Sequence, residues 1–222
     1  MIIDCISDLH GHYPEMPGGD LLIIAGDVTE SNTFAAHLIF LIWLHNQKYR
    51  HYIFIAGNHD NILLERSLLS LPLSNTTYLF DSGTEFEGLK IWGSPWTQTF
   101  KDMNPYCRAF TVDAEEELEQ KFNLIPDDID ILITHSPPYG IMDEVIEYGP
   151  FSHERKKSVG SKSLLVKCLE IRPKLHVYGH IHEAYGQDLW KNSIKNRDIL
   201  FVNASHVNEN YKPVNKPIRV IL

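Results

Sequence analysis

The chain has 222 residues, of which 43% are hydrophobic, so it can bury a sizeable core and is most simply one domain, residues 1–222. Its net charge of −9 comes from 29 acidic and 20 basic side chains, which argues against stable binding of duplex nucleic acid. Three cysteines without a CxxC spacing favour reduced thiols in the cytoplasm. The longest apolar run, 38–44, is far shorter than the ~20 residues of a membrane span, so we expect a cytoplasmic protein with no membrane partner.

Five short apolar runs along the chain each lead into polar side chains. In chain order they lead into Asp8 and His10, into Asp27, into Asn58 and His59, into His135, and into His180 and His182. A buried strand that stops at a turn projects the next residues from the carboxyl edge of a sheet, where open α/β sheets bind ligands. We therefore expect these side chains to meet at one site.

Three segments have the pattern of helices. Asn32 is predicted to cap a helix over 33–48, which would connect two parallel strands. Residues 113–123 predict an acidic amphipathic helix whose glutamates face solvent, and residues 161–171 predict a helix with one apolar side. Helices that alternate with buried strands indicate an α/β protein.

The second half of the chain predicts a further sheet. Residues 76–81 and 84–93 have the pattern of antiparallel strands in a second sheet, and 199–203 and 218–221 are predicted to close it. The polar segment 142–160 has no such pattern and is predicted to be mobile.

Two aspartates, one asparagine and four histidines at strand ends are suitable ligands for catalytic divalent cations, and the absence of thiolate argues against a structural zinc site. Each residue also has a plainer interpretation. Asp27 and Asn58 are common turn or cap residues, His135 could be a hydrogen-bonded histidine, and a pair such as His180 and His182 occurs on surfaces by chance. Their joint occurrence at five strand ends favours a metal centre.

The ordered set D-x-H, G-D, G-N-H-D, T-H and G-H-x-H resembles the calcineurin-like metallophosphoesterase superfamily over residues 8–182. Further segments are similar to its metallophosphoesterase-domain (UPF0046) branch, which is related to class III cyclic nucleotide phosphodiesterases: 93–97, 134–138, 172–183 and 203–205. The resemblance implies an α/β fold, a four-layer αββα sandwich of two mixed β-sheets flanked by helices.

The resemblance also implies a centre of two divalent metal ions. Asp8, His10 and His182 would hold one ion, Asn58, His135 and His180 the other, and Asp27 would bridge both. Manganese is the first expectation, with iron, zinc, nickel or magnesium as alternatives. In such a centre a bridging hydroxide attacks the phosphorus of a phosphoester.

Three further residues bear on catalysis and substrate. His59 is similar in position to the family histidine that contacts the phosphate or leaving group, which makes it an electrophile or general acid. Glu30 stands where related phosphatases have an aspartate, so it could orient His59. Ser31 stands where those phosphatases have arginine, and without that bidentate partner a phosphomonoester dianion is held less well. The sequence therefore predicts a hydrolase for small phosphodiesters, with cyclic nucleotides as candidate substrates.

Other functions stay open on the sequence alone. The same centre could serve a phosphomonoesterase, or a nuclease that uses the basic cluster of Arg155, Lys156 and Lys157. A scaffold that binds metal without catalysis is a third alternative, and a homodimer is left open.

Loop aromatic residues could also contact a substrate base, or they could simply pack in the core. These candidates are Trp96, Tyr106, Phe110, Tyr139 and Phe151.

Overall fold

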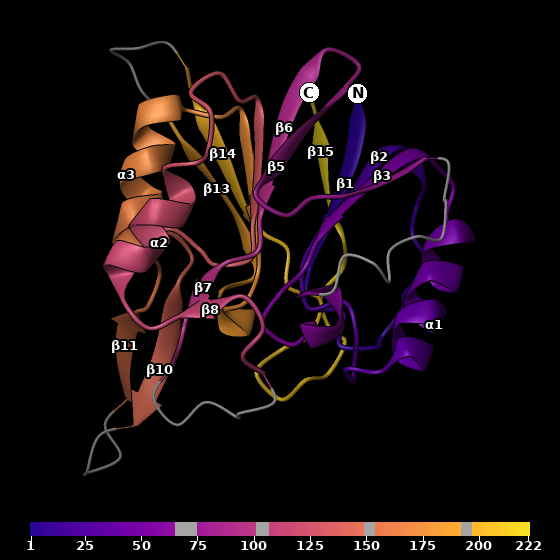
Figure 1. Cartoon of the computed structure of the whole chain (residues 1–222), viewed down its shortest axis with the longest axis horizontal. Coiled ribbons are helices and arrows are strands. Elements are labelled where there is room, and N and C mark those ends of the chain that lie inside the picture. Colours follow the sequence, from indigo (N-terminus) through magenta and orange to yellow (C-terminus); the bar gives the residue numbers. More distant parts are fainter. Residues whose placement is uncertain (65–74, 101–106, 149–153, 192–196) are drawn as a thin grey trace.

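The computed structural model describes residues 1–64, 75–100, 107–148, 154–191 and 197–222. Two β-sheets lie face to face at the centre of the molecule, and helices cover their outer faces (Figure 1). The layers are the four-layer αββα sandwich expected from the sequence, which confirms the predicted fold class.

The first sheet has the strand order β15-β1-β2-β3-β4. Four of its strands run parallel: β1 (Ile2–Ile6), β2 (Gly19–Ala25), β3 (Tyr49–Ile55) and β4 (Thr76–Tyr78). The edge strand β15 (Ile218–Ile221) is antiparallel to β1. Helix α1 (Phe34–His45) packs on the outer face, where Phe40 and Leu44 join Ile24 and Phe54 in one buried cluster.

The second sheet has the order β13-β14-β12-β9-β6-β5. Its central strands are parallel: β6 (Leu89–Ser94), β9 (Ile131–Thr134), β12 (Leu175–Tyr178) and β14 (Ile199–Asn203). Its edges are antiparallel: β5 (Ser82–Phe86) and β13 (Gly186–Trp190). Helices α2 (Glu115–Phe122) and α3 (Lys162–Ile171) cover the outer face, with Phe122 and Cys168 packed near Tyr178 and Phe201.

Alternate side chains of the central strands fill the space between the two sheets. Ile3 and Cys5 of β1 and Ile23 of β2 share a buried cluster with Ile133 of β9 and Val177 of β12. Because side chains alternate along a strand, the intervening residues face the helices instead. The apolar runs are thus buried on both faces, and the polar residues follow where each run ends.

Smaller elements connect these layers. Strands β7 (Thr97–Gln98) and β8 (Thr111–Val112) pair in parallel, and 3₁₀ turns cover η1 (Asn61–Leu64) and η3 (His182–Ala184). None of the helices in the described ranges is long and apolar enough to cross a membrane.

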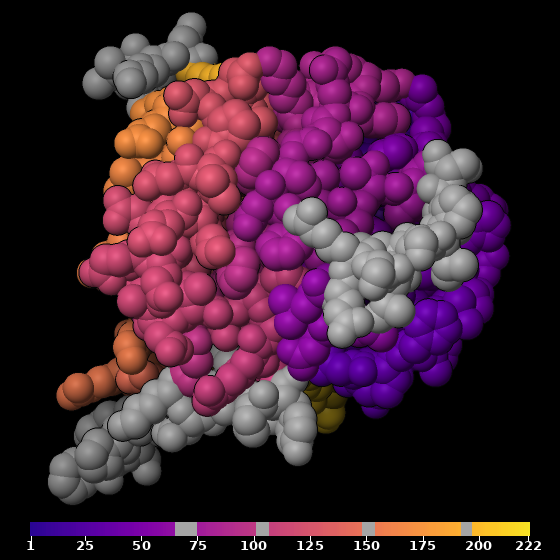
Figure 2. All heavy atoms as spheres, in the orientation of Figure 1, coloured from indigo at the N-terminus to yellow at the C-terminus, as the bar shows by residue number. Residues whose placement is uncertain are grey.

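The polar segment predicted to be mobile instead contains an antiparallel hairpin, which projects at the lower left of the body (Figure 2). It consists of β10 (Glu144–Tyr148) and β11 (Glu154–Ser158). Lys156 and Lys157 of the basic cluster are each 2.9 Å from a glutamate of β10. Side chains on both faces of this hairpin are largely exposed, so its strands lack the alternation of apolar and polar residues that predicts a strand. The sequence pattern therefore did not reveal it.

Three sequence predictions about elements are wrong. Strand β4, within the predicted strand 76–81, pairs with β3 in the first sheet, and β15 pairs with β1 rather than closing the second sheet. The cap of α1 is Thr33, whose hydroxyl accepts a hydrogen bond from the Ala36 amide, and not Asn32. Apolar pattern identifies a strand, but it does not identify the neighbour of an edge strand.

Candidate metal centre

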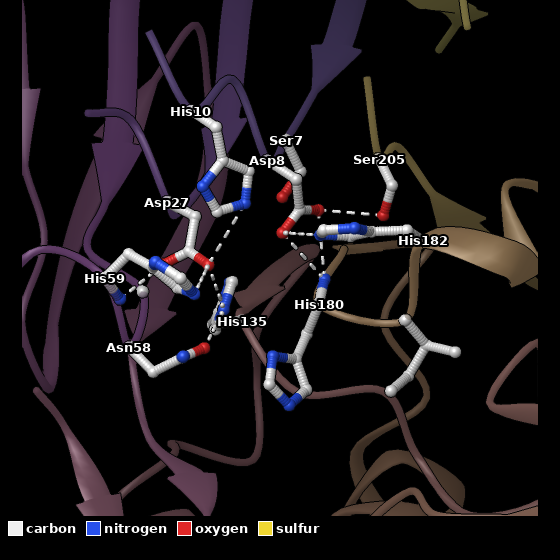
Figure 3. Close-up of polar contacts among 12 residues, drawn as sticks. Ser7, Asp8, His10, Asp27, Asn58, His59, His135, His180, His182 and Ser205 are labelled. Atoms are coloured by element: carbon white, nitrogen blue, oxygen red, sulfur yellow. Dashed lines mark hydrogen bonds and ion pairs between the residues drawn. The ribbon is translucent and has the colours of Figure 1, made fainter. Parts of the chain in front are cut away.

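The carboxyl ends of the parallel strands of both sheets meet at one place (Figure 3). The turns after β1 and β2 are joined by two hydrogen bonds of 3.0 Å, from the Asp8 amide to the Gly26 carbonyl and from the His10 amide to the Asp27 carbonyl. The Ser7 amide donates to the Ala204 carbonyl at 2.8 Å, which links the first sheet to the second. Residues from both sheets therefore share one rigid site.

Four of the predicted ligands have a left-handed backbone. The φ angles are 51° at Asp8, 43° at His10, 52° at Asp27 and 71° at His180. This conformation is unfavourable for residues other than glycine and is concentrated at functional sites, where the surrounding structure holds it. The strand-to-turn transitions thus aim these side chains at the cost of local strain.

Two glycines allow the close approach of the carboxylates. A Cβ atom at Gly57 would clash with the carboxylate of Asp27, and one at Gly179 would clash with that of Asp8. The glycines that end the apolar runs are therefore required for the packing of the site as well as for its turns.

The first predicted ligand set is assembled around Asp8. The carboxylate of Asp8 accepts hydrogen bonds from the His180 amide at 3.0 and 3.1 Å and from the Ser205 hydroxyl at 2.8 Å. His182 Nε2 lies 3.4 Å from Asp8 Oδ1. Ligand atoms of Asp8, His10 and His182 lie within 4.8 Å of one another, a grouping that could hold a metal ion.

The second predicted set is less compact: among the described residues, His135 shares a grouping of possible ligand atoms with Asp8 and Asp27, and His180 belongs to none. The Nε2 atom of His135 lies 3.0 Å from Asn58 Oδ1, and the rings of His135 and His180 are 4.9 Å apart. His135 Nδ1 donates to the Ala25 carbonyl at 3.0 Å. This bond fixes the tautomer and orients Nε2 toward the site, as carbonyl partners of metal-binding histidines do.

Asp27 lies between the two sets. Its Oδ2 atom is 3.6 Å from His10 Nε2 and 3.4 Å from His135 Nε2, while Oδ1 accepts a hydrogen bond of 2.8 Å from the His59 amide. Asp27 is 1% exposed, so most of the partners for its charge come from the protein. One buried carboxylate oxygen is thus within reach of ligands from both sets.

One imidazole nitrogen in each set has no hydrogen-bond partner among the described residues. These buried atoms are Nε2 of His10 and Nε2 of His180. A buried polar atom without a partner is costly and needs an explanation. Burial lowers the pKa of His10 to about 4 and that of His180 to about 3, so both rings are neutral and can donate a lone pair. The residues therefore fit divalent cations.

The buried carboxylates of Asp8 and Asp27 remain anionic. Burial alone would raise the pKa of Asp8, but the hydrogen bond and charge of His182 lower it below its usual range. Burial also opposes ionisation of Asp27, and the charges of His135 and His59 outweigh it and lower the pKa. At His135, burial is outweighed by Asp27 and Asp8, which raise the pKa to about 9. In the absence of bound cations, protonated His135 therefore balances part of this negative charge.

His59 lies beside the centre with one face toward the cavity. Its Nε2 atom is 4.0 Å from Asp27 Oδ2, and its side chain is 22% exposed. Its Nδ1 atom lies 3.3 Å from the Cys107 thiol, a contact that sequence reasoning missed. Glu30 is exposed, and the hydrogen bonds and ion pairs described for this chain do not connect it to His59, so its orienting role stays a prediction.

Asp60 stabilises the backbone around the centre. Its buried carboxylate accepts hydrogen bonds from the amides of Val28 at 3.1 Å, Thr29 at 3.2 Å and Gly57 at 2.9 Å. It thereby holds the turn that carries Asp27. The G-N-H-D motif indicated that Asp60 lies near the site. It did not show whether the Asp60 carboxylate would bind a cation or accept hydrogen bonds from the backbone.

A cavity of about 280 Å³ opens onto the centre. Its described lining residues are Asp27, Asn58, His59, Phe100, Cys107, His180, His182 and Tyr211. Trp96 is not among them, because its Nε1 atom donates to Asp81 and its ring packs against Phe80 and Phe110. The candidates Tyr106 and Phe151 lie outside the described residues.

Comparisons with known proteins agree with this geometry. The family model for calcineurin-like phosphoesterases matches residues 1–184. The chain is 35% identical to metallophosphoesterase domain-containing protein 1 of Homo sapiens, over 98% of this chain and 70% of that protein. It is 32% identical to a UPF0046 protein of Caenorhabditis elegans, over 96% of this chain and 78% of that protein. The resemblance to this superfamily and branch is confirmed.

Solved structures have the same fold at low sequence identity. A protein of Thermus thermophilus superposes with a TM-score of 0.57 and 15% identity, over 92% of this chain and 90% of that chain. Another solved structure gives a TM-score of 0.63 at 14% identity, over 91% and 89% of the two chains.

Proposed function

Because the chain belongs to the calcineurin-like phosphoesterase family and is a metal-dependent phosphoesterase, we propose that it hydrolyses small phosphodiesters at a centre of two divalent cations. The observation that carries the two-cation proposal is the position of Asp27 Oδ2 between His10 and His135. Cyclic nucleotides are candidate substrates, and manganese is the first candidate for the cations.

The two predicted sets would hold the cations. Asp8, His10 and His182 would hold one, Asn58, His135 and His180 the other, and Asp27 would contact both. When bound, two such ions would neutralise phosphoryl oxygens and lower the pKa of water so that it can attack at neutral pH. The chain itself supplies the anionic carboxylates of Asp8 and Asp27 and the neutral imidazoles of His10 and His180.

His59 is the proposed proton donor to the leaving group. It lines the cavity without belonging to either predicted ligand set, and its ring lies beside Asp27. The contact with the Cys107 thiol occupies Nδ1, which leaves Nε2, 4.0 Å from Asp27 Oδ2, as the nitrogen that would deliver the proton. A donor at this place assists departure of the alcohol.

The charge of the cavity supports a diester rather than a monoester. Neither lysine nor arginine occurs among its described lining residues, and Ser31 is exposed. A monoester dianion benefits from positive charge beyond the cations, whereas a diester carries one negative charge that the cations can neutralise. The substrate preference therefore follows from the scarcity of basic groups in this part of the site.

A substrate panel in Mn²⁺ tests the proposal. We expect kcat/KM to be higher for bis-p-nitrophenyl phosphate or a cyclic nucleotide than for p-nitrophenyl phosphate, and activity to disappear with a chelator. The Asp27→Asn variant serves as the control for contaminating hydrolases. A preference for p-nitrophenyl phosphate over all diesters would make the protein a phosphomonoesterase.

A further inference from the structure

A tyrosine beyond the region matched by the family model lies at the metal centre. Tyr211 belongs to the connection between β14 and β15, drawn in yellow at the lower edge of the molecule (Figure 1). Asn208 organises this connection: its amide donates to the Lys212 carbonyl at 2.9 Å, and its carbonyl accepts from the Tyr211 amide at 2.8 Å. Its Oδ1 atom also accepts from the Lys212 amide at 3.0 Å.

The same connection is attached to the predicted ligands. The Asn208 carbonyl lies 3.2 Å from His182 Nδ1, so it fixes the tautomer that leaves His182 Nε2 facing the centre. The position of Tyr211 is therefore coupled to the geometry of the first ligand set.

The ring of Tyr211 contacts the histidines of the centre. Its centroid is 4.8 Å from that of His10 and 5.3 Å from that of His182, both in edge-to-face geometry, and 6.2 Å from that of His59. Tyr211 is nevertheless 49% exposed and has a φ angle of 57°. About half of the ring thus stays accessible beside the predicted ligands, and a left-handed backbone at a residue other than glycine is concentrated at functional sites.

A second aromatic side chain borders the other ligand set. The ring of Phe100 stacks on that of His180, with centroids 5.2 Å apart and planes 25° from parallel. Phe100 and Tyr211 both line the cavity. Each predicted cation position therefore has an aromatic neighbour, one from the connection after β7 and one from the connection before β15.

Among the described lining residues, little else can bind the organic part of a substrate. Apart from the predicted ligands, His59 and Cys107, the described lining consists of these two aromatic side chains. An aromatic face favours a flat apolar group through offset or edge-to-face stacking. A sugar or a charged group would instead need hydrogen-bond donors or opposite charges.

We propose that Tyr211 and Phe100 contact the substrate and select phosphoesters that carry an aromatic group, either a nucleobase or an aryl ring. This inference rests on the proposed function, because it requires the phosphoryl group to bind at the cations. It adds the chemical class of the ester substituent and a contact residue outside the matched family region.

Binding of two non-hydrolysable phosphonates separates recognition of the ring from recognition of the phosphoryl group. Phenylphosphonate and methylphosphonate are titrated by calorimetry into Mn²⁺-loaded protein, with metal content measured in parallel. We expect the wild-type chain to bind phenylphosphonate about tenfold more tightly than methylphosphonate, a difference shared between the two aromatic contacts.

Variants then assign the difference to the two side chains. Asparagine tolerates a left-handed backbone, so Tyr211→Asn removes the ring with the loop conformation kept. We expect Tyr211→Asn and Phe100→Ala each to reduce the phenyl preference from about tenfold to about threefold, with methylphosphonate affinity and metal content unchanged. Tyr139, which is 39% exposed and does not line the cavity, provides the matched control Tyr139→Asn, which should retain the preference.

Two results would overturn the inference in different ways. If Tyr211→Asn lost affinity equally for both phosphonates, the tyrosine ring would only hold the metal-binding histidines in position. Equal wild-type affinity for the two phosphonates would mean that the site does not recognise aromatic groups. If the wild-type protein bound neither phosphonate and did not hydrolyse bis-p-nitrophenyl phosphate, the proposed phosphoryl site would itself be wrong, and this inference would fall with it. If it hydrolysed that diester but bound neither phosphonate, the proposed recognition of the aromatic group alone would be wrong.

Discussion

Asp27 joins the two ligand sets through a single oxygen atom. In Asp27→Asn a neutral amide would replace the carboxylate near both predicted cations, and an amide bridges two cations poorly. We expect metal content to fall at both positions together, and kcat/KM to fall on the order of 10²-fold or more. Elemental analysis of the purified variant checks the first effect. Full activity, or loss of one metal only, would show that Asp27 does not bridge.

His59 adjoins a predicted ligand but is assigned to protonate the leaving group. His59→Ala should lower turnover by ~10² to 10⁴, with metal content near that of the wild type. Loss of one metal would instead make His59 a ligand, a role compatible with its grouping with His10 and Asp27. Glu30→Gln is the matched comparison, because an equal fall in turnover would support the orienting role assigned from the sequence.

His176 is a buried histidine in the second sheet, outside both predicted ligand sets. Burial lowers its pKa to about 3, and its ring nitrogens contact the Thr134 hydroxyl at 2.8 Å and the Cys168 thiol at 3.4 Å. Below pH 6.5 the unfolded chain binds a proton at this residue that the folded chain does not. The free energy of unfolding therefore falls as the pH drops from 6.5 toward 3, by up to about 1.4 kcal/mol per pH unit.

The variant His176→Gln isolates this contribution. Urea unfolding at pH 7.5 and pH 5 should show a loss of stability that is about 2 kcal/mol smaller in the variant than in the wild type. The variant should also be less stable at pH 7.5, since it loses part of the hydrogen-bond network. An unchanged pH dependence would show that another group controls acid unfolding.

Sequence pattern located most elements at the scale of strands and helices. The runs before Asp8 and His180 are apolar and end abruptly, so both the strands and the positions of the polar residues could be predicted. Strand partners could not, since the apolar pattern of β15 is equally compatible with either sheet. Phe100 and Tyr211 lie in connections without periodicity, and their position depends on tertiary contacts that sequence pattern does not encode.

The acidic run of α2 illustrates a further limit. All its glutamates were expected to face solvent, but the carboxylate of Glu115 accepts hydrogen bonds at the start of α3, from Ser161 at 2.7 Å and from the Ser163 amide at 2.8 Å. Glu115→Ala should therefore lower the free energy of unfolding by about 1–2 kcal/mol. The exposed neighbour provides the control Glu116→Ala, which should change it by less than about 0.5 kcal/mol. Equal effects in urea unfolding would show that Glu115 does not join the helices.

At the scale of the whole molecule, the predicted ligands come from both sheets. Cations that bind there stabilise only the folded chain, and at 100 times the dissociation constant each site adds about 2.7 kcal/mol. For a chain of this size we expect two bound Mn²⁺ ions to raise the melting temperature by roughly 10 to 20 °C relative to chelator-treated protein. Calorimetry checks this, and Asp27→Asn should show a smaller shift. An unchanged melting temperature would contradict metal binding between the two sheets.

The expectation of a single domain over residues 1–222 stays a prediction.

The contact between Asp8 and Ser205 spans 197 residues of chain, and β1 is paired with β15 near the other end. At the usual pace of translation, Ser205 leaves the ribosome roughly 10 to 40 s after Asp8. During that interval the nascent chain has β1 but lacks the hydroxyl that holds Asp8, as well as Asn208, which orients His182. Assembly of the site, and with it the uptake of metal, must therefore follow synthesis of the chain through Asn208.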